Sequence, residues 1–410
     1  WGRRSAIAMA TILFLCNSIR TPHTVVTTQS AGGGRQEETL TRPFCSWEDI
    51  RNGAWLKSPT QQVQYWPAEG AWIRKEARQE YQWFPEGTNI TGGNNAIDAN
   101  GTSISSTCQY EHEFNSTLFC NLMTNSVVMF IGDSVQWEMY ESLVVLLNSP
   151  IFPVRQVHIE ATQTKGLPVV MNVCQDKNVT LIYRSSLKLE ENDHIESIER
   201  MMTEYFPTAI VLNTGAHPQP DDRYASNVDD ALRRMREWQR RCRQLDLSCP
   251  FFWRTTAPGI PDCNSFAEPV NDVARMQRHV ESKPKYNWAQ MAHQNDIALS
   301  ILRNMSKAED GNEGGGRLHY EIIDGYEIDI QRPDHRSCTE RNKACKANDC
   351  LHQKYPDVAN AHNAVFLHYL RSHRSADEIA RIIDYEYDFS RVTNVRRDGL
   401  VVAFDPRNKV

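Results

Sequence analysis

The sequence has no strong excess of charge of either sign. Its 45 lysines and arginines are set against 51 aspartates and glutamates, and the formal net charge is −6. Acidic and basic residues are mixed along the chain, so the composition argues against a nucleic-acid-binding protein and predicts no nucleic-acid partner. The arginine-rich segment 233–243 is interpreted as the solvated face of a helix. Internal repeats and a linker in the middle of the chain are also lacking, which favours one elaborated domain.

The chain also lacks, near its start, an apolar run as long as a typical membrane span. The uncharged residues 5–19 follow Arg3 and Arg4, whereas a transmembrane helix needs about 20 apolar residues. A secretory signal of this size is usual, and a signal anchor with its positive residues in the cytoplasm is the alternative. Residues 1–20 are therefore predicted to be a signal peptide or signal-anchor segment. Residues 21–42, rich in Thr, Gly, Gln and Ser, are predicted to be a flexible stem.

Glycosylation acceptors and cysteines predict a luminal or extracellular location for the rest of the chain. Asn-x-Ser/Thr acceptor sequences are present at Asn89, Asn100, Asn115, Asn178 and Asn304. Such sequences are used on the surface of secreted proteins. The chain has 11 cysteines, and ten remain when Cys16 in the amino-terminal segment is set aside. An even number in an oxidising compartment predicts up to five disulfides, whose connectivity the sequence leaves open.

Apolar runs and helical periodicity alternate along most of the chain. Strands are predicted at 126–131, 179–183, 208–212, 250–253 and 319–323. Helices are predicted at 135–147, 194–205, 227–245, 285–306 and 358–371. This alternation is typical of an α/β fold with a mostly parallel sheet covered by helices on both faces. In such a sheet the functional site lies at the carboxyl ends of the strands. We predict one catalytic domain over 43–395, followed by a C-terminal tail at 396–410.

The segment 127–134, Val-Val-Met-Phe-Ile-Gly-Asp-Ser, carries the strongest functional signal. An apolar run that ends in Gly-Asp-Ser and continues at helical spacing predicts a buried strand, a tight turn and a helix. Ser134 would then lie where the first-turn N–H groups and the helix dipole stabilise a developing anion. That position suits a nucleophile. The alternative is that Asp133 and Ser134 only cap an ordinary helix.

A base and its orienting acid are predicted near the carboxyl end of the chain. Asp349 and His352 are three residues apart in a turn that precedes a helical segment. The carboxylate would hold one ring nitrogen of His352, and the other nitrogen would take the serine proton. Other histidines compete for this role, namely His217, His293, His335, His362 and His368.

The run 209–213 ends in Asn213 and predicts a second strand that reaches the same sheet edge. The Asn213 amide would point at the oxyanion that forms during acyl transfer, a contact worth about 3 kcal/mol. The alternative is that Asn213 and Gly215 merely end a strand. Cys338, Cys345 and Cys350, with nearby histidines, could instead bind zinc. That reading is disfavoured because a paired Cys-x-x-Cys is lacking and His352 is needed as the base, so no metal is predicted.

These motifs together resemble the SGNH/GDSL hydrolase superfamily. Within it, the resemblance is to the PC-esterase branch that contains the plant trichome birefringence-like polysaccharide O-acetyltransferases. The similar blocks follow the family order over 127–370: Gly132-Asp133-Ser134 with Glu141-Ser142-Leu143, Asn213-Thr214-Gly215-Ala216-His217, Phe252-Trp253-Arg254-Thr255-Thr256-Ala257-Pro258, Arg332-Pro333-Asp334-His335 and Asp349-Cys350-Leu351-His352. One departure is that residues 353–357 read Gln-Lys-Tyr-Pro-Asp, where the plant members have Trp-Cys-Leu-Pro-Gly.

The resemblance implies a three-layer, SGNH-hydrolase-like (flavodoxin-like) fold elaborated by disulfide-linked loops. It also implies a Ser134–His352–Asp349 triad, with the Ser134 backbone N–H and Asn213 forming the oxyanion hole. Asp133, Gly215, Arg254 and Trp137 are candidate substrate-binding residues. For Arg254 the alternative is a structural ion pair beside Trp253 at the end of a buried strand.

The implied function is acetyl transfer to hydroxyls of a polysaccharide or glycan through an acyl-serine intermediate. No bound cofactor is expected, and the acetyl donor would be acetyl-CoA or a derived acetyl carrier. Expected partners are the glycan acceptor and a membrane transporter of the donor. The expected location is the Golgi lumen, as a single-pass type II membrane protein or as a secreted one. The alternatives are a secreted carbohydrate esterase with the same triad and a binding protein with a decayed site.

Overall fold

The computed structural model describes residues 44–57, 63–65, 76–78, 81–86, 88–91, 103–105, 108–110, 113–147, 168–174, 177–190, 198–283, 286–307, 316–336, 349–353 and 357–373. The predicted signal segment 1–20, the stem 21–42, the tail 396–410 and Asn100 lie outside these residues. Within these ranges every helix is too short or too polar to cross a lipid bilayer.

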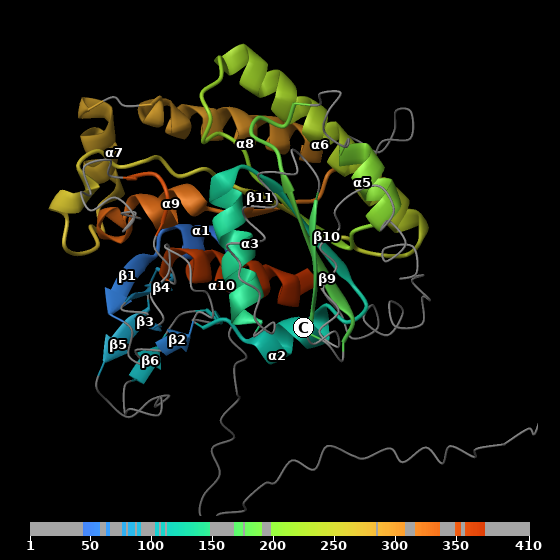
Figure 1. Ribbon diagram of the computed structural model, residues 1–410, viewed down its shortest axis with the longest axis horizontal. Coiled ribbons are helices and arrows are strands. Elements are labelled where there is room, and N and C mark those ends of the chain that lie inside the picture. The colour runs from blue at the N-terminus through green and yellow to red at the C-terminus, as the bar shows by residue number, and fades with distance from the viewer. Residues whose placement is uncertain are drawn as a thin grey trace, which may run out of the picture. The chain divides into compact units, whose positions relative to one another are not determined.

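A six-stranded sheet forms the centre of the described fold (Figure 1). Its strands are β7 (Val127–Gly132), β8 (Val169–Val173), β9 (Val179–Ser185), β10 (Ala209–Leu212), β11 (Phe251–Arg254) and β12 (Glu321–Ile323). Their order across the sheet is β12-β11-β10-β7-β9-β8, and only the pairing of β8 with β9 is antiparallel. Read from β9 to β12, the parallel strands come second, first, third, fourth and fifth along the chain. This is a doubly wound order, and its direction reverses between β7 and β10.

Helices cover both faces of the sheet (Figure 1). The first face is covered by α2 (Ser116–Leu122), α3 (Ser134–Leu146) and α10 (Asp357–His373), and the second by α5 (Ile198–Tyr205), α6 (Asp221–Gln244) and α8 (Met291–Lys307). Alternate residues of β7 explain the two layers, because successive strand side chains point to opposite faces. Val128 and Phe130 belong to the first buried cluster, whereas Met129 and Ile131 belong to the second. The predicted α/β fold with a mostly parallel sheet and flanking helices is confirmed.

The smaller elements lie before the first sheet strand, between β11 and β12, or after β12. They are α1 (Trp47–Arg51), α7 (Val273–Ser282), α9 (Gly325–Ile330) and the short helical turns Cys263–Ser265, Trp288–Gln290 and Pro333–His335. Three antiparallel pairs precede the sheet: β1 (Ala54–Lys57) with β4 (Tyr81–Phe84), β2 (Val63–Tyr65) with β3 (Glu76–Arg78), and β5 (Asn89–Thr91) with β6 (Ser103–Ser105).

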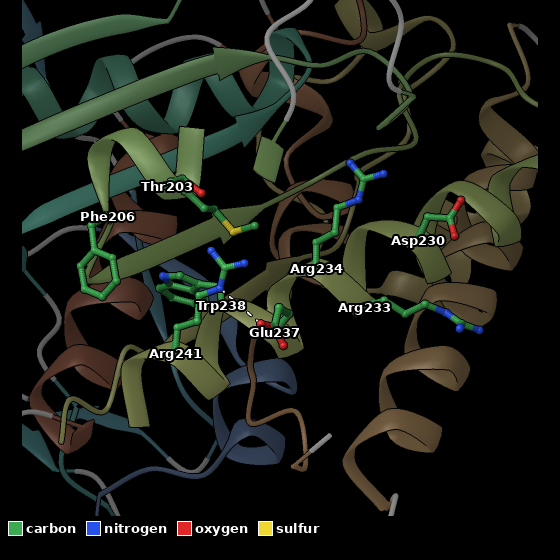
Figure 2. A pocket seen from close by; sticks show the side chains of 9 residues that line it. Thr203, Phe206, Asp230, Arg233, Arg234, Glu237, Trp238 and Arg241 are labelled. Carbon is green, nitrogen blue, oxygen red and sulfur yellow. Dashed lines mark hydrogen bonds and ion pairs between the residues drawn. The ribbon is translucent and has the colours of Figure 1, made fainter. Parts of the chain in front are cut away.

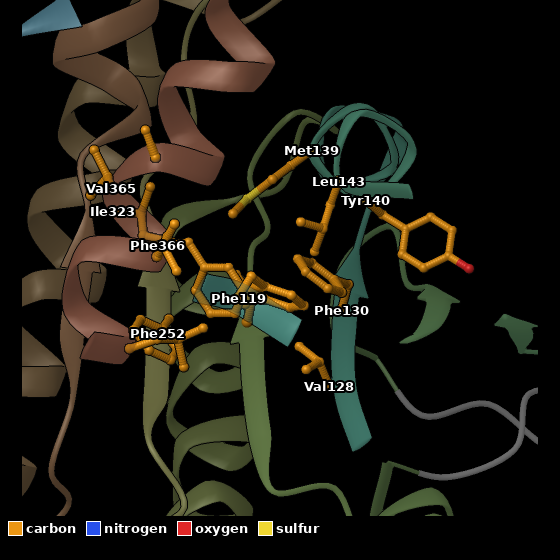
Figure 3. Close-up of a cluster of buried hydrophobic side chains, with 14 of the residues drawn as sticks. Phe119, Val128, Phe130, Met139, Tyr140, Leu143, Phe252, Ile323, Val365 and Phe366 are labelled. Atoms are coloured by element: carbon orange, nitrogen blue, oxygen red, sulfur yellow. The ribbon is translucent and has the colours of Figure 1, made fainter. Parts of the chain in front are cut away.

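The core on the first face joins α10 to the sheet (Figure 3). The Phe366 ring of α10 packs edge-on against Phe252 of β11 at 4.8 Å and against Phe130 of β7 at 5.9 Å between centroids. Each such aromatic pair contributes about 0.5–1.5 kcal/mol beyond its buried area. Almost the whole of α10 is buried, from Asp357 to Leu370. The helix is therefore held firmly in the fold a few residues after the predicted base.

Four disulfides connect the described residues, at Cys45–Cys108, Cys120–Cys174, Cys242–Cys249 and Cys263–Cys350. They confirm that the chain is disulfide-bonded and supply the connectivity that the sequence left open. Because the sulfur of Cys350 is bonded to Cys263, it is not free to bind zinc. Cys338 and Cys345 lie outside the described residues.

Candidate active site

The Gly132-Asp133-Ser134 turn joins the central strand β7 to α3. Asp133 is the N-cap residue, and its Oδ1 accepts a hydrogen bond from the Val135 N–H at 3.0 Å. Its Oδ2 accepts from the Ala216 N–H at 3.1 Å, which ties the turn to the loop after β10. Ser134 is the first helical residue and is partly exposed, whereas Asp133 and Val135 are buried. The sequence-predicted position of Ser134, at the end of a strand and the start of a helix, is confirmed.

The Gly132-Asp133-Ser134 turn also packs closely against its neighbours. The Tyr183 hydroxyl of β9 lies 3.1 Å from the Gly132 carbonyl oxygen and 3.0 Å from that of Asp133. A Cβ atom at Gly132 would lie 2.7 Å from the Gln136 Cβ and 2.9 Å from the Asn213 carbonyl oxygen. Only glycine fits there without displacing backbone, so the turn can bring β7 and β10 close together.

Ser134, His352 and Asp349 form a continuous chain of hydrogen-bonding contacts. The Ser134 Oγ lies 2.8 Å from His352 Nε2, and His352 Nδ1 lies 2.7 Å from Asp349 Oδ2. Ser134 and His352 are 218 positions apart in the sequence, whereas Asp349 precedes His352 by three. About a third of the His352 side chain is exposed, so solvent reaches the middle of the chain of contacts. Such an arrangement can activate a serine hydroxyl for attack on a carbonyl carbon.

Neighbouring carboxylates favour the charged form of the His352 ring. Burial acts against the imidazolium, but the hydrogen bond to Asp349 and the negative charges of Glu138, Asp349 and Asp133 outweigh it. Together they raise the pKa of His352 to about 9. For Asp349, burial acts to raise the pKa, but the hydrogen bonds and the charge of His352 lower it overall. Asp349 is therefore ionised at neutral pH, as an orienting acid must be.

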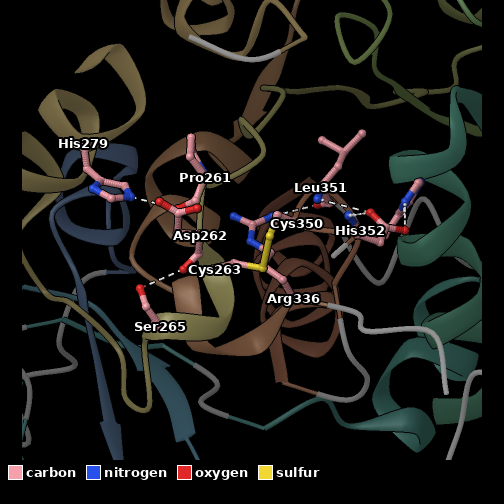
Figure 4. Close-up of a disulfide and its surroundings, with 10 residues drawn as sticks. Pro261, Asp262, Cys263, Ser265, His279, Arg336, Cys350, Leu351 and His352 are labelled. Carbon is pink, nitrogen blue, oxygen red and sulfur yellow. Dashed lines mark hydrogen bonds and ion pairs between the residues drawn. A yellow bond between two sulfur atoms is a disulfide. The ribbon is translucent and has the colours of Figure 1, made fainter. Parts of the chain in front are cut away.

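Several bonds hold the loop 349–353, which carries the base and its acid (Figure 4). Asp349 Oδ1 accepts from the N–H groups of Leu351 at 3.2 Å and His352 at 3.1 Å. Arg336 Nη1 donates to the Leu351 carbonyl oxygen at 2.8 Å. The Cys263–Cys350 disulfide attaches the loop to the segment after β11, and the Ile260 N–H donates to the Cys350 carbonyl oxygen at 2.9 Å.

Asn213 lies at the end of β10, as predicted, but its amide hydrogens are used within the protein. Its Nδ2 donates to the Arg254 carbonyl oxygen at 3.0 Å and to Thr256 Oγ1 at 2.7 Å. The residue is fully buried and links the ends of β10 and β11. In this conformation the side chain serves as a bridge between strands, and its role in an oxyanion hole stays a prediction.

The residues predicted to contact substrate are mostly buried. Arg254 is 1% exposed and forms an ion pair with Asp329 at 3.5 Å, which is the structural alternative given from the sequence. Trp137 packs against the rings of Tyr140 and Tyr183. Asp133 is also buried, so a direct substrate contact by any of these three side chains would require the site to rearrange.

Gly215 has a φ of +128°, in the region that favours glycine, and its position faces Thr256. This geometry lets the chain turn away from β10 toward Ala216, whose N–H holds Asp133. Contact between Gly215 and a substrate stays a prediction.

Four of the competing histidines have partners away from Ser134. His293 pairs with Asp221, His335 with Asp357 and His362 with Asp329, and the His368 ring contacts the Cys45 carbonyl oxygen. His217 lies in the loop between β10 and α6 and is partly exposed. Among the histidines that the structure describes, His352 is the one that contacts Ser134.

The structure adds one residue that the sequence analysis missed, Glu138. Its Oε1 accepts from the Gln353 N–H at 2.9 Å, directly beside His352. The spacing contained a signal, because Glu138 follows Ser134 by four residues and must therefore share its helix face.

A separate hollow of about 330 Å³ lies between α5 and α6 (Figure 2). Met202 and Trp238 form part of its apolar wall, and arginines of α6 lie at its edge. Two of these arginines are paired along the helix, Arg233 with Asp229 and Arg241 with Glu237. Residues of the triad do not line the hollow, so it is distinct from the candidate active site.

The chain matches no protein-family model and no curated protein.

Proposed function

We propose that this protein transfers an acetyl group to a glycan hydroxyl through an acyl-serine intermediate, with an SGNH/GDSL-type site that resembles the PC-esterase branch. The observation that carries the proposal is the Ser134–His352–Asp349 chain of contacts at the carboxyl end of the central strand. Its distances, 2.8 and 2.7 Å, are those that proton transfer through an imidazole requires.

The sheet supports the same assignment. The order β9-β7-β10-β11-β12 of the parallel strands is the flavodoxin-like order, which an SGNH-type fold has. In open sheets of this kind, ligands bind where the strand order reverses. Here that point lies between β7 and β10, which end at Gly132 and Leu212 and lead into Ser134 and Asn213.

In the first half-reaction the serine oxygen would attack the acetyl carbonyl carbon. His352 Nε2 takes the Ser134 proton as the new carbon–oxygen bond forms, while Asp349 stabilises the imidazolium. The oxyanion lies near the first turn of α3, where N–H groups lack intrahelical acceptors. The Ser134 N–H is the donor we assign, with Asn213 as the predicted second one. His352 then protonates the leaving group, which departs with its electron pair.

In the second half-reaction an acceptor hydroxyl would replace the leaving group. His352 removes the proton of that hydroxyl, the oxygen attacks the acyl-serine carbonyl, and Ser134 leaves with a proton returned from His352. The acetyl donor, acetyl-CoA or a derived carrier, enters as a substrate. A glycan hydroxyl as acceptor gives an ester, whereas water gives acetate.

An assay of the purified full chain with an acetyl donor tests the proposal. The donors are acetyl-CoA and, as an activated ester, 4-nitrophenyl acetate, each with and without an oligosaccharide. We expect acetylated oligosaccharide, with donor consumption that rises when the sugar is added. Acetate release at a rate that the oligosaccharide does not change would instead identify an esterase. An unconsumed donor in every mixture would contradict acyl transfer by this site.

We also propose that the domain works in an oxidising, luminal compartment, with the Golgi lumen and membrane attachment as the assigned setting. A donor made in the cytosol would then reach it through a membrane transporter. The four disulfides support an oxidising compartment. Of the five predicted acceptors, Asn115, Asn178 and Asn304 are exposed.

Enzymatic removal of N-glycans is expected to lower the mass of the secreted or membrane-bound protein. Asn304 lies exposed on α8, so N304Q should lower the number of N-glycans, counted by mass during partial deglycosylation, by one. The control N227Q changes a helical asparagine outside an acceptor sequence and should leave the number of N-glycans unchanged. A protein whose mass is unaffected by the glycosidase would contradict the luminal assignment.

Loss of the Cys263–Cys350 disulfide is expected to slow the reaction more than loss of Cys242–Cys249. Cys350 lies between Asp349 and His352, and the bridge fixes the loop that carries both. A displacement of about 1 Å at a catalytic group costs about 10²-fold in rate, so the double variant C263A/C350A should lose on the order of 10- to 100-fold. The matched variant C242A/C249A opens a bridge between the last turn of α6 and the segment before β11. Equal turnover in the two variants would argue against this positioning role.

A further inference from the structure

We propose that Glu138 is a positioning residue that holds the base-bearing loop 349–353 against the helix of the nucleophile. The proposal rests on the proposed function, because it concerns the same serine and histidine. It assigns a role to a buried carboxyl that the triad chemistry does not itself use.

Two adjacent residues of the loop are bonded to one face of one helix. Ser134 and Glu138 are four residues apart in α3 and therefore lie one turn apart on the same face. The His352 ring contacts Ser134 Oγ at 2.8 Å, and the Gln353 N–H donates to Glu138 Oε1 at 2.9 Å. Because the helix is rigid, it fixes the distance between these two points. The imidazole is thus set against the nucleophile by a bond that is independent of the serine itself.

The bond is shielded from water. Glu138 is 7% exposed and Gln353 is 3% exposed. A backbone N–H in such a place needs an acceptor, since an unpaired buried donor is costly. Among the described residues Glu138 Oε2 has no hydrogen-bond partner. The bond from the Gln353 N–H to Oε1 is therefore the hydrogen bond that the structure gives this carboxyl.

The charged neighbours of Glu138 come from several elements. His352 of the loop and Arg254 of β11 favour its ionised form, Asp329 of α9 disfavours it, and Arg336 also lies within electrostatic range. Burial is the largest influence and raises the pKa of Glu138 to about 8. A carboxyl that is protonated near neutral pH still presents an oxygen to the Gln353 N–H, so the contact does not require a charge.

The charge of Glu138 would affect the pH at which His352 becomes a base. An ionised Glu138 stabilises the imidazolium and raises the pKa of His352. The neutral ring, which accepts the serine proton, forms as the pH rises through that pKa. Removing the ionisable carboxyl should therefore move the rise in activity to lower pH. A residue that only filled space would not shift this profile.

The test compares E138Q and E138L in the full chain with a fluorophosphonate probe. Ser134 Oγ displaces fluoride from the phosphorus of this probe, so the labelling rate reports on the activated serine without a known substrate. E138Q keeps an oxygen for the Gln353 N–H, whereas E138L removes it. We expect E138L to label about 100-fold more slowly than the native protein. E138Q should stay within about tenfold, and its labelling should rise at lower pH than that of the native chain.

A third variant separates positioning from general stability. Ser142 lies on the same helix, is buried, and bonds to Asn360 and Asn363 of α10. S142A should lower the melting temperature but leave the labelling rate within a fewfold of the native rate. E138L labelling at the native rate, or E138Q as slow as E138L with an unshifted pH profile, would overturn the role of Glu138. A native protein that is not labelled at Ser134 would overturn the proposed function and the role of Glu138 with it.

Discussion

Replacing Ser134 with alanine is expected to lower acetyl transfer by about 10⁴- to 10⁶-fold, as in other triads that lose their nucleophile. The reason is that Ser134 Oγ is the atom that His352 Nε2 contacts at 2.8 Å. Without it no acyl-serine can form. Peptide mass spectrometry after incubation with 4-nitrophenyl acetate should locate the acetyl group on the peptide that contains Ser134, and this adduct should be missing in S134A.

A double variant gives the sharper form of this test. Members of a triad act as a unit, so S134A/H352A should lose no more activity than S134A alone. The control is H293A, since His293 is exposed and pairs with Asp221 at 3.3 Å. That variant should retain the native rate. Two results would contradict a catalytic role for Ser134 and His352. One is an acetyl adduct that still forms in S134A, and the other is a double variant that loses much more activity than S134A.

Replacing Asp329 with alanine is expected to lower the free energy of unfolding by about 3–5 kcal/mol, because it leaves an uncompensated charge in the interior. Asp329 is fully buried, and its carboxylate lies 3.5 Å from Arg254 Nη2 and 2.6 Å from His362 Nε2. Burial alone would raise the pKa of Asp329, but His362, Arg254 and Arg336 lower it overall. The Asp329 contribution should therefore be present at neutral pH and be lost as the pH falls through its folded pKa.

Urea unfolding of the full chain measures this loss. The control D221A removes a carboxylate whose pairing with His293 is exposed, and it should cost less than about 1 kcal/mol. Equal destabilisation by D329A and D221A would show that the buried pair contributes no more than a surface one. If acid lowers the unfolding free energy of the native protein but not that of D329A, the result supports a lowered pKa for Asp329 in the folded state.

The parallel strands and the positions of Ser134, Asp349 and His352 could be predicted because each has a local signature. A strand buried on both faces appears as an unbroken apolar run, and β7 is buried at every position. A residue at the end of such a strand is placed by the strand itself. Ser134 and the Asp349–His352 pair therefore needed no knowledge of long-range packing. Their meeting required only that the two segments reach the same edge of the sheet.

Other parts depend on contacts that the local sequence does not encode. Strand β8 was missed because its pairing with β9 is antiparallel and falls outside the alternation of parallel strands and helices from which the other strands were predicted. Helix α6 begins at Asp221 rather than at 227, because Pro220 and two acidic residues suit a helix start before the apolar periodicity becomes visible. α9 has six residues, too few for a periodic pattern. The Asn213 bonds were unpredictable because Arg254 ends the neighbouring strand and Thr256 lies in the loop after it.

The long separation in sequence between Ser134 and His352 has a consequence during synthesis. Ser134 and His352 are 218 residues apart, and ribosomes add about 5–20 residues per second, so roughly 10 to 45 seconds pass between them. Throughout that interval the growing polypeptide carries its serine without an imidazole to activate it. On the proposed function, the nascent chain therefore transfers no acyl group through Ser134 until His352 has emerged and its loop has docked.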